Sequence, residues 1–244
     1  MTAQPPLIYD IGMNNGDDCA YYLAKGYRVV AIEANPILCD FVRLRFKAEI
    51  AAQRLIVLNT GIAGEPGQLP FYVHRSNSVL STFQPPGERV GYTATLPDDQ
   101  FVVIIAPVQR LSDIIGRYGS PEYIKIDIEG YDLQCLADLA ANQIAPRYLS
   151  AEAHTLDVFG YFEAMQYASF KLTAGRTVAQ EFSYCKITTL DGGAKVYSFN
   201  EHSSGPFGED IPGPWLEREA ALTAWINRPP GWFDLHAMRT ISAD

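Results

Sequence analysis

The sequence predicts a doubly wound α/β fold, in which a mostly parallel sheet carries helices on both of its faces. The first observation is a series of short, near-continuous apolar runs, which are typical of strands buried on both sides. The second is that helical segments alternate with these runs, as the crossovers of a parallel sheet require. The third is that the 244 residues show neither an internal repeat nor a dividing linker, which favours one large domain.

The first quarter of the chain alternates strand and helix. We expect strands at 7–11, 27–32 and 54–59, with helices at 19–25 and 36–53 between them. Asp17 and Asp18 place negative charge at the start of the first helix, Gly26 ends it, and Pro36 opens the second. This part of the chain therefore supplies one half of the expected sheet.

The pattern continues after an irregular middle region. Residues 60–100 are rich in Gly, Pro, Ser and Thr and hold one short strand, at 69–74. Further strands are expected at 101–106, 123–128, 147–152, 170–174 and 195–199, and further helices at 111–118, 132–142 and 158–168. The strand at 195–199 is the last one that the pattern predicts.

The ligand-binding domain is expected to span residues 1–200. Residues 201–244 are rich in Pro, Gly and Trp and carry one helix near 214–225, so we expect a C-terminal flap or helical extension of the same domain. The irregular segments 76–100 and 203–215 are candidate lids, because long loops in compact domains are usually functional.

Charge and composition exclude several classes of protein. The net charge of −9 repels phosphate backbones, so no nucleic-acid partner is expected. Since no run of about 18 apolar residues occurs and the first residues do not form a signal peptide, we expect no membrane insertion. Cys19, Cys39, Cys135 and Cys185 form no CxxC pair, which fits reduced thiols in the cytoplasm. No heptad or apolar stripe indicates an oligomeric state.

The turn after the first strand is the expected ligand site, because ligands of doubly wound sheets bind beyond the carboxyl ends of the strands. It reads Asp-Ile-Gly-Met-Asn-Asn-Gly over 10–16. Gly12 allows the backbone to approach a ligand, and Gly16 allows the next helix to pack on the strand. The dinucleotide pattern GxGxxG would need glycines where Asn14 and Asp17 stand.

Acidic residues in and after this turn favour a cationic ligand. Asp10, Asp17 and Asp18 would repel a diphosphate, by roughly 4 kcal/mol for like charges about 4 Å apart at an effective dielectric of 20. S-adenosylmethionine has no phosphate, carries an ammonium and a sulfonium, and has a ribose. Glu33 ends the second strand, 17 residues after Gly16, where its carboxylate can accept hydrogen bonds from both ribose hydroxyls. The pattern therefore predicts S-adenosylmethionine as the cofactor.

Several ordered blocks over roughly residues 7–200 resemble the FkbM-type methyltransferases. The blocks are 10–16, Ala-Ile-Glu-Ala-Asn-Pro at 31–36, Asn59 with 62–64, Ser-Val-Leu at 78–80, Ile-Lys-Ile-Asp-Ile-Glu-Gly at 124–130 and Tyr-Leu-Ser-Ala-Glu-Ala-His at 148–154. Met13 and the tail segment 203–210 depart from the family pattern.

This resemblance implies a class I methyltransferase with a seven-stranded, Rossmann-like sheet that methylates hydroxyl groups of sugars, polyketides or other small metabolites. The cofactor-binding residues expected from the turn and the resemblance together are Asp10, Gly12, Asn14, Gly16, Glu33, Asn35, Asn59 and Asp127. The methyl acceptor does not follow from the resemblance.

Four polar residues at two later strand ends are the candidate catalytic residues. Methyl transfer is an in-line displacement that needs close alignment, and an oxygen acceptor must also lose a proton. Asp127 and Glu129 close the fourth central strand, and Glu152 and His154 close the next, where an extended segment points both side chains to one side. Alternatively, Asp127 caps a turn, Glu129 caps the next helix and His154 is merely exposed.

No metal site is predicted, since no spacing among these four residues demands one, although their oxygen-rich chemistry would suit a hard cation such as Mg²⁺. Two other functions stay open. A nicotinamide-dependent oxidoreductase could use the same fold, and a non-catalytic interaction protein could keep the cofactor site alone. N-methylation is also open beside O-methylation.

Overall fold

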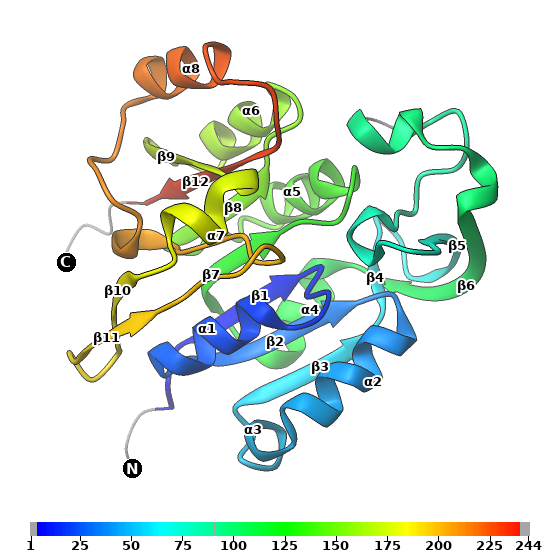
Figure 1. The fold of residues 1–244 in the computed structure, drawn as a ribbon, viewed down its shortest axis with the longest axis horizontal. Coiled ribbons are helices and arrows are strands. Elements are labelled where there is room, and N and C mark those ends of the chain that lie inside the picture. The colour runs from blue at the N-terminus through cyan, green and yellow to red at the C-terminus, as the bar shows by residue number, and fades with distance from the viewer. Residues whose placement is uncertain (1–3, 90, 240–244) are drawn as a thin grey trace.

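A seven-stranded sheet forms the centre of the computed structural model, which describes residues 4–89 and 91–239 (Figure 1). Its strand order is β3-β2-β1-β7-β8-β12-β9. The strands are β3 (Leu55–Asn59), β2 (Arg28–Glu33), β1 (Leu7–Ile11), β7 (Pro121–Ile126), β8 (Tyr148–Glu152), β12 (Phe233–Met238) and β9 (Ser169–Ala174). β12 runs antiparallel to the other six strands of this sheet, so the predicted mostly parallel, doubly wound sheet is confirmed.

Helices cover both faces of this sheet, as predicted. One face packs against α4 (Leu111–Tyr118), α5 (Asp132–Ala141), α6 (Asp157–Ala164) and α8 (Arg218–Ile226). The other face packs against α1 (Asp17–Lys25), α2 (Pro36–Arg45), α3 (Lys47–Ala51) and α7 (Val178–Glu181). Alternate residues of each strand serve the two faces, so Tyr9 and Ile11 join the first core and Ile8 joins the second.

The order of the strands reverses at β1, which lies between β2 and β7. The chain first winds outward through β2 to β3 and later returns to pair β7 with the other edge of β1. The crevice at the carboxyl ends of β1 and β7 is therefore the topological switch point, where doubly wound sheets bind ligands.

The irregular middle of the chain forms a second, smaller sheet to one side of the first (Figure 1). It consists of β4 (Gly61–Ile62), β5 (Gly67–His74) and β6 (Phe101–Gln109), with β5 and β6 as an antiparallel pair. Both longer strands were expected near these positions. Between them lie short 3₁₀ turns: η1 (Ser78–Leu80), η2 (Gly91–Thr95) and η3 (Asp98–Gln100).

The helix expected at 36–53 is divided, which corrects the prediction. α2 ends at Arg45 and α3 begins at Lys47, because Phe46 has a non-helical backbone with φ −113° and ψ 35°. The Phe46 ring is buried and would lie 2.9 Å from a Cβ added at Gly16. The break thus lets the ring pack against the start of α1.

The C-terminal segment contributes a strand that the sequence pattern did not predict. β12 inserts between β8 and β9, so the expectation that 195–199 holds the last strand is wrong. That earlier region forms β11 (Ala194–Tyr197), which pairs with β10 (Cys185–Thr188) in a separate hairpin. Asp234 and His236 alternate with apolar residues in β12. Such alternation is typical of a strand with one face exposed to solvent, but both residues are buried.

The tail helix is also shorter at its start than expected. α8 begins at Arg218, whereas residues 214–217 are not helical, and Leu216 forms a bridge with Phe170. The division of the chain at residue 200 stays a prediction. Within 4–89 and 91–239, no helix has the length and apolar character needed to cross a membrane.

Candidate active site

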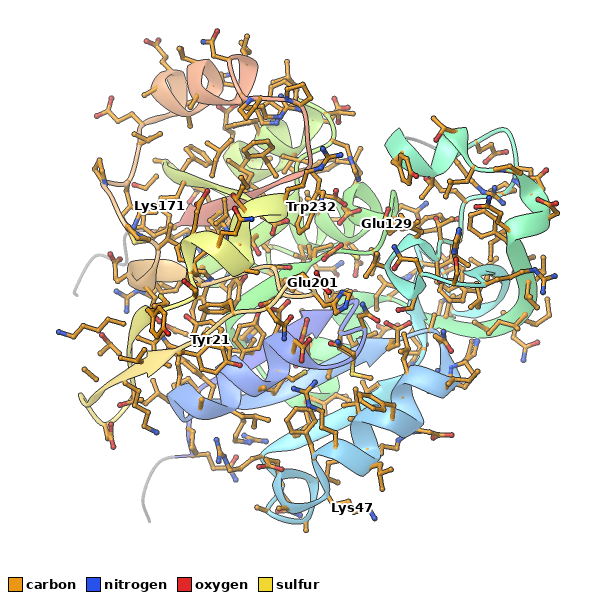
Figure 2. The ribbon with its side chains drawn as sticks, in the orientation of Figure 1. Tyr21, Lys47, Glu129, Lys171, Glu201 and Trp232 are labelled. Atoms are coloured by element: carbon orange, nitrogen blue, oxygen red, sulfur yellow. The ribbon has the colours of Figure 1, made fainter. Side chains whose placement is uncertain are left out.

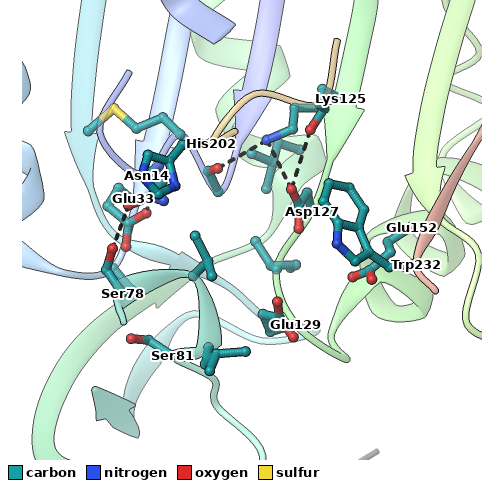
Figure 3. A pocket seen from close by; sticks show the side chains of 18 of the residues that line it. Asn14, Glu33, Ser78, Ser81, Lys125, Asp127, Glu129, Glu152, His202 and Trp232 are labelled. Atoms are coloured by element: carbon teal, nitrogen blue, oxygen red, sulfur yellow. Dashed lines mark hydrogen bonds and ion pairs between the residues drawn. The ribbon is translucent and has the colours of Figure 1, made fainter. Parts of the chain in front are cut away.

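A cavity of about 930 Å³ opens at the switch point, a volume typical of small-molecule sites. Glu129, Glu201 and Trp232 come from distant parts of the sequence and gather near the middle of the molecule (Figure 2). The cavity is lined by the ends of β1, β2, β7 and β8, by loop residues of 76–83 and by two tail segments, 201–204 and 231–232 (Figure 3).

Gly12 brings the turn after β1 into contact with the segment after β7. A Cβ at Gly12 would lie 1.9 Å from the backbone oxygen of Asp127, and the residue has φ +82°. The position therefore requires glycine. Gly16 lies away from the cavity, where a Cβ would meet Phe46, which fits its predicted role in helix packing.

Glu33 is held at the cavity wall by two backbone groups. The amide of Asn14 donates to its Oε2 at 3.1 Å, and the amide of Asn35 donates to its Oε1 at 2.8 Å. Ser78 in turn donates to the side-chain oxygen of Asn14 at 2.9 Å (Figure 3). Burial raises the pKa of Glu33. Each carboxylate oxygen can still accept a further hydrogen bond, so the group is positioned for a ligand.

Four predicted cofactor residues support this wall without lining it. The Asn35 side chain caps α2 by accepting from the amide of Ile37 at 3.0 Å. The Asn59 amide group donates to the backbone oxygens of Glu33 and Ala34 at 3.0 and 3.1 Å. Asp10 and Gly16 are likewise outside the lining, whereas Gly12, Asn14, Glu33 and Asp127 belong to it.

Lys125 is a buried cation at the centre of the site that sequence reasoning did not single out. Its Nζ lies 3.6 Å from Asp10 and 3.4 Å from Asp18. It also lies 3.3 Å from Asp127 (Figure 3). It also donates to the backbone oxygen of Gly12 at 3.2 Å. Burial opposes its charge, but the carboxylates of Asp127, Asp10 and Asp18 raise the pKa of Lys125 above its usual value. A lysine inside an otherwise apolar strand was the available signal.

Asp10 faces this lysine from β1. Its carboxyl is fully buried, and the Cys19 thiol donates to it at 3.1 Å. Burial raises the pKa of Asp10 to about 6, an effect that Lys125 opposes. Asp10 therefore organises the charge beneath the cavity rather than forming its surface.

The tail closes the cavity beside Asp18. Ser203 donates its hydroxyl to Asp18, and the amide of Ser204 donates to the same carboxylate at 3.1 and 3.2 Å. The Ser204 hydroxyl also lies 3.5 Å from Asp127. Segment 203–215 was a candidate lid, and its first residues do form part of the cavity wall.

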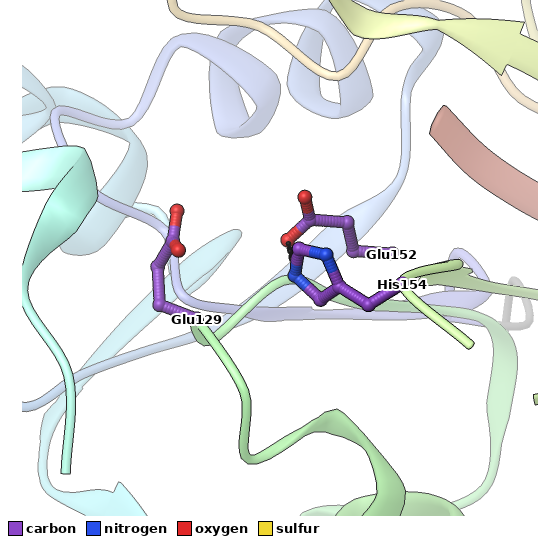
Figure 4. Close-up of side chains that lie close together, drawn as sticks. All are labelled: Glu129, Glu152 and His154. Atoms are coloured by element: carbon purple, nitrogen blue, oxygen red, sulfur yellow. Dashed lines mark ion pairs between the residues drawn. The ribbon is translucent and has the colours of Figure 1, made fainter. Parts of the chain in front are cut away.

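The opposite end of the cavity holds three of the four predicted catalytic residues. Glu129, Glu152 and His154 each offer one atom, and these atoms lie within 4.8 Å of one another (Figure 4). Glu152 Oε2 is 2.8 Å from His154 Nε2. Burial raises the pKa of both glutamates, and the contact with Glu152 raises the pKa of His154. Asp127 lines the same cavity between this cluster and Lys125.

The backbone of Glu129 is held in an unusual conformation. Its φ is +47°, and its carbonyl accepts a hydrogen bond from the Thr82 hydroxyl at 2.7 Å. A non-glycine residue in this region costs free energy, and such residues concentrate at functional sites. The alternative that Glu129 caps the next helix is wrong, because the N-cap residue of α5 is Tyr131.

Asp234 is an acidic neighbour that sequence reasoning missed together with its strand. It lies opposite Glu152 in the register of β12 with β8 and is 2% exposed. Burial raises the pKa of Asp234, and Asp127 and Glu152 add to the shift. Trp232, two residues earlier, lines the cavity and packs so closely over Gly175 that a Cβ there would lie 1.9 Å from its ring.

The strand order, with one antiparallel strand, and the ligand-sized cavity at the switch point define a Rossmann-like, doubly wound fold. The family model of the methyltransferase FkbM domain matches residues 10–170. The chain belongs to the FkbM methyltransferase family. This membership favours methyl transfer over the nicotinamide-dependent alternative.

Several solved structures that are similar to the chain are named as methyltransferases. A methyltransferase FkbM from Methylobacillus flagellatus KT is 19% identical, with a TM-score of 0.47, and the match covers 71% of this chain and 41% of that one. A precorrin-6y C5,15-methyltransferase from Geobacter metallireducens GS-15 is 11% identical, with a TM-score of 0.41, over 97% of this chain and 81% of that one. No curated protein matches the sequence.

Proposed function

We propose that the protein transfers the methyl group of S-adenosylmethionine to a hydroxyl oxygen of a sugar, a glycan or another small metabolite. One observation carries the proposal. A single cavity has a positioned carboxylate, Glu33, at one end and the cluster of Glu129, Glu152 and His154 at the other. A bisubstrate reaction needs this arrangement, because the two reactants must meet between their binding groups.

The first end has the features that the cofactor requires. Glu33 has acceptor capacity left for ribose hydroxyls, and Gly12 lets the turn after β1 lie directly against the backbone of Asp127 at the cavity wall. Asp18 and Asp127 contribute negative charge to the cavity, which suits the ammonium and sulfonium of the cofactor. We expect Asp10, Gly16, Asn35 and Asn59 to act indirectly, by holding these groups in place.

The second end has the features that an oxygen acceptor requires. S-adenosylmethionine supplies a methyl group on a sulfonium, which is a good leaving group. The acceptor oxygen must align with that methyl carbon at about 3 Å and give up its proton. Glu129, Glu152 and His154 bind the hydroxyl and take the proton in this proposal, with Asp127 aligning the acceptor. A neutral amine needs no base before attack, so such a cluster favours oxygen over nitrogen.

Calorimetric titration with S-adenosylhomocysteine tests the cofactor end. Glu33→Ala should weaken binding by about 1.5–3 kcal/mol, because it removes hydrogen bonds to a charged group. Glu219→Ala, an exposed glutamate of α8, is the matched control and should bind like wild type. The proposal fails if wild type binds no S-adenosylhomocysteine.

Incubation with methyl-labelled cofactor and a panel of sugars, glycans and polyketide alcohols tests the acceptor. A methyl ether in the product, identified by NMR, is the expected result. Methylated nitrogen in place of the ether would contradict O-methylation.

We also expect the protein to act in the cytoplasm, because its four cysteines are all free and buried.

A further inference from the structure

We propose that Glu129, Glu152 and His154 bind one divalent cation of the Mg²⁺ or Mn²⁺ type at the acceptor end of the cavity. The ion would bind the acceptor oxygen directly. Its role in methyl transfer rests on the proposed function, whereas the binding of the ion does not.

The geometry of the three side chains is close to that of a ligand set. Their ligand atoms lie within 4.8 Å of one another. Ligands about 2.1 Å from a common ion are separated by roughly 3 to 4 Å, so small side-chain rotations would complete the site. Glu152 and His154 already touch at 2.8 Å, and Glu129 faces them across the cavity (Figure 4).

The chemistry of the donors selects the type of cation. Two carboxylates and one imidazole offer mainly hard oxygen ligands, which suit Mg²⁺ and Mn²⁺, together with a nitrogen that Mn²⁺ accepts readily. No cysteine belongs to the cluster. Three protein ligands would leave coordination positions for water and for the acceptor oxygen.

Asp234 gives an independent indication that a cation belongs here. It is 2% exposed, lies opposite Glu152 in the sheet register and leaves the sheet on the same face. Among residues 4–89 and 91–239, no group donates a hydrogen bond to its Oδ2. A buried carboxylate oxygen without a donor is costly, and a nearby divalent ion would offset that cost.

Protein cations do not fill this role. Lys125 is shared among Asp10, Asp18 and Asp127. In the described part of the chain, neither lysine nor arginine forms an ion pair with Glu129 or Glu152. Among the described residues, the ion-pair partner of Glu152 is therefore the His154 imidazole.

Access to the cluster is open from the cavity. The His154 side chain is 28% exposed, and all three residues line the cavity. With the ion bound, the three residues would act as its ligands and not as the base. The ion would lower the pKa of the acceptor hydroxyl, whose proton would then pass to a water molecule instead of to the cluster. The oxygen then forms its bond to the methyl carbon as the carbon–sulfur bond breaks and its electron pair stays on sulfur. No oxidant or reductant is needed.

Titration of the full chain with manganese chloride, followed by the electron paramagnetic resonance signal of free Mn²⁺, tests the site. We expect one Mn²⁺ per chain for wild type. Glu129→Gln and His154→Gln should each weaken binding at least tenfold, and Glu219→Gln, outside the cavity, should leave it unchanged. Absence of a stoichiometric site in wild type, or binding by the two cluster variants as tight as that of wild type, would overturn the inference.

Calorimetry with S-adenosylhomocysteine on the same samples separates the two proposals. Cofactor binding without Mn²⁺ binding rejects the metal site alone, and Mn²⁺ binding without cofactor binding rejects the methyltransferase assignment alone. Glu129 is half-buried, so its variant should fold. Retained cofactor affinity in both cluster variants shows that lost Mn²⁺ binding reports the ligands and not the fold.

Discussion

Lys125 Nζ lies 3.3 Å from Asp127 Oδ2, and the two residues join the floor of the cavity to its acceptor end. The lysine belongs to β7, and the aspartate follows that strand at the switch point. Their contact sets the charge of the whole site, because the same ammonium also compensates Asp10 and Asp18.

Replacing Lys125 by methionine should destabilise the fold strongly. The change leaves buried carboxylates without their cation, which typically costs about 3–5 kcal/mol. Urea unfolding at neutral pH measures the loss. Lys47→Met is the matched control, because Lys47 is exposed on α3 and points away from the body of the protein (Figure 2). A loss below about 1 kcal/mol for Lys125→Met, comparable with a surface change, would contradict the role given to this lysine.

Gly12→Ala should abolish most cofactor binding and lower stability. The added Cβ would lie 1.9 Å from the Asp127 backbone oxygen, and the φ of +82° is unfavourable for alanine. We expect a loss of affinity for S-adenosylhomocysteine of tenfold or more, measured by calorimetry. Gly64→Ala serves as the control, since no atom lies within 4 Å of a Cβ there. Equal affinities of the two variants would show that the close approach is unimportant.

Stability should fall in acid because of His236. Burial, with Lys171 nearby, lowers the pKa of His236 to about 3. In the unfolded chain, this imidazole has a pKa of about 6.5 and binds a proton below that pH. In the native protein it stays neutral until about pH 3. This residue alone should therefore cost about 2 kcal/mol of unfolding free energy between pH 7.5 and pH 5.

Urea unfolding of His236→Gln over that pH range checks this contribution. Its stability should depend less steeply on pH than that of wild type, by the same amount. His202→Gln, an exposed histidine, should keep the wild-type slope. If the His236→Gln and wild-type curves are parallel, the burial of a neutral imidazole does not explain the acid sensitivity.

Ser203→Ala should loosen the tail from the cavity wall. The hydroxyl donates to Asp18, and its loss leaves a buried carboxylate oxygen without that donor, at a cost of about 1–3 kcal/mol. Hydrogen exchange of segment 201–205 should accelerate, and S-adenosylhomocysteine should dissociate faster. Ser198→Ala, whose hydroxyl lies on the exposed hairpin, is the control. Unchanged exchange in 201–205 would show that backbone contacts alone hold the tail.

The central sheet was predictable because its strands are buried on both faces and read as apolar runs. Asp127, Glu129, Glu152 and His154 could be brought together in advance for a related reason: carboxyl ends of neighbouring parallel strands meet at one edge. Glu33 could be predicted as a cavity residue because it stands at the end of β2. Their roles in catalysis and cofactor binding stay predictions.

The rest of the site depends on pairings between distant segments. Asp18 finds its partners in Ser203 and Ser204, which lie 185 and 186 residues further along the chain. Asp234 enters the site only because β12 inserts beside β8, and no local pattern encodes that register. The periodicity of apolar residues indicates which face of a segment is buried. It does not indicate which other segment packs or pairs against that face.

The insertion of β12 between β8 and β9 has a consequence for the order of assembly. β9 has no direct pairing with β8 in the sheet, so the part of the first core around Phe170, Leu235 and Ala237 stays open until residues 233–238 leave the ribosome. Because synthesis is slow compared with local folding, β8 has an unpaired edge until β12 has been synthesised. Trp232 and Asp234 arrive with that last strand. A molecule that has not finished its sheet therefore also lacks one wall of the cavity.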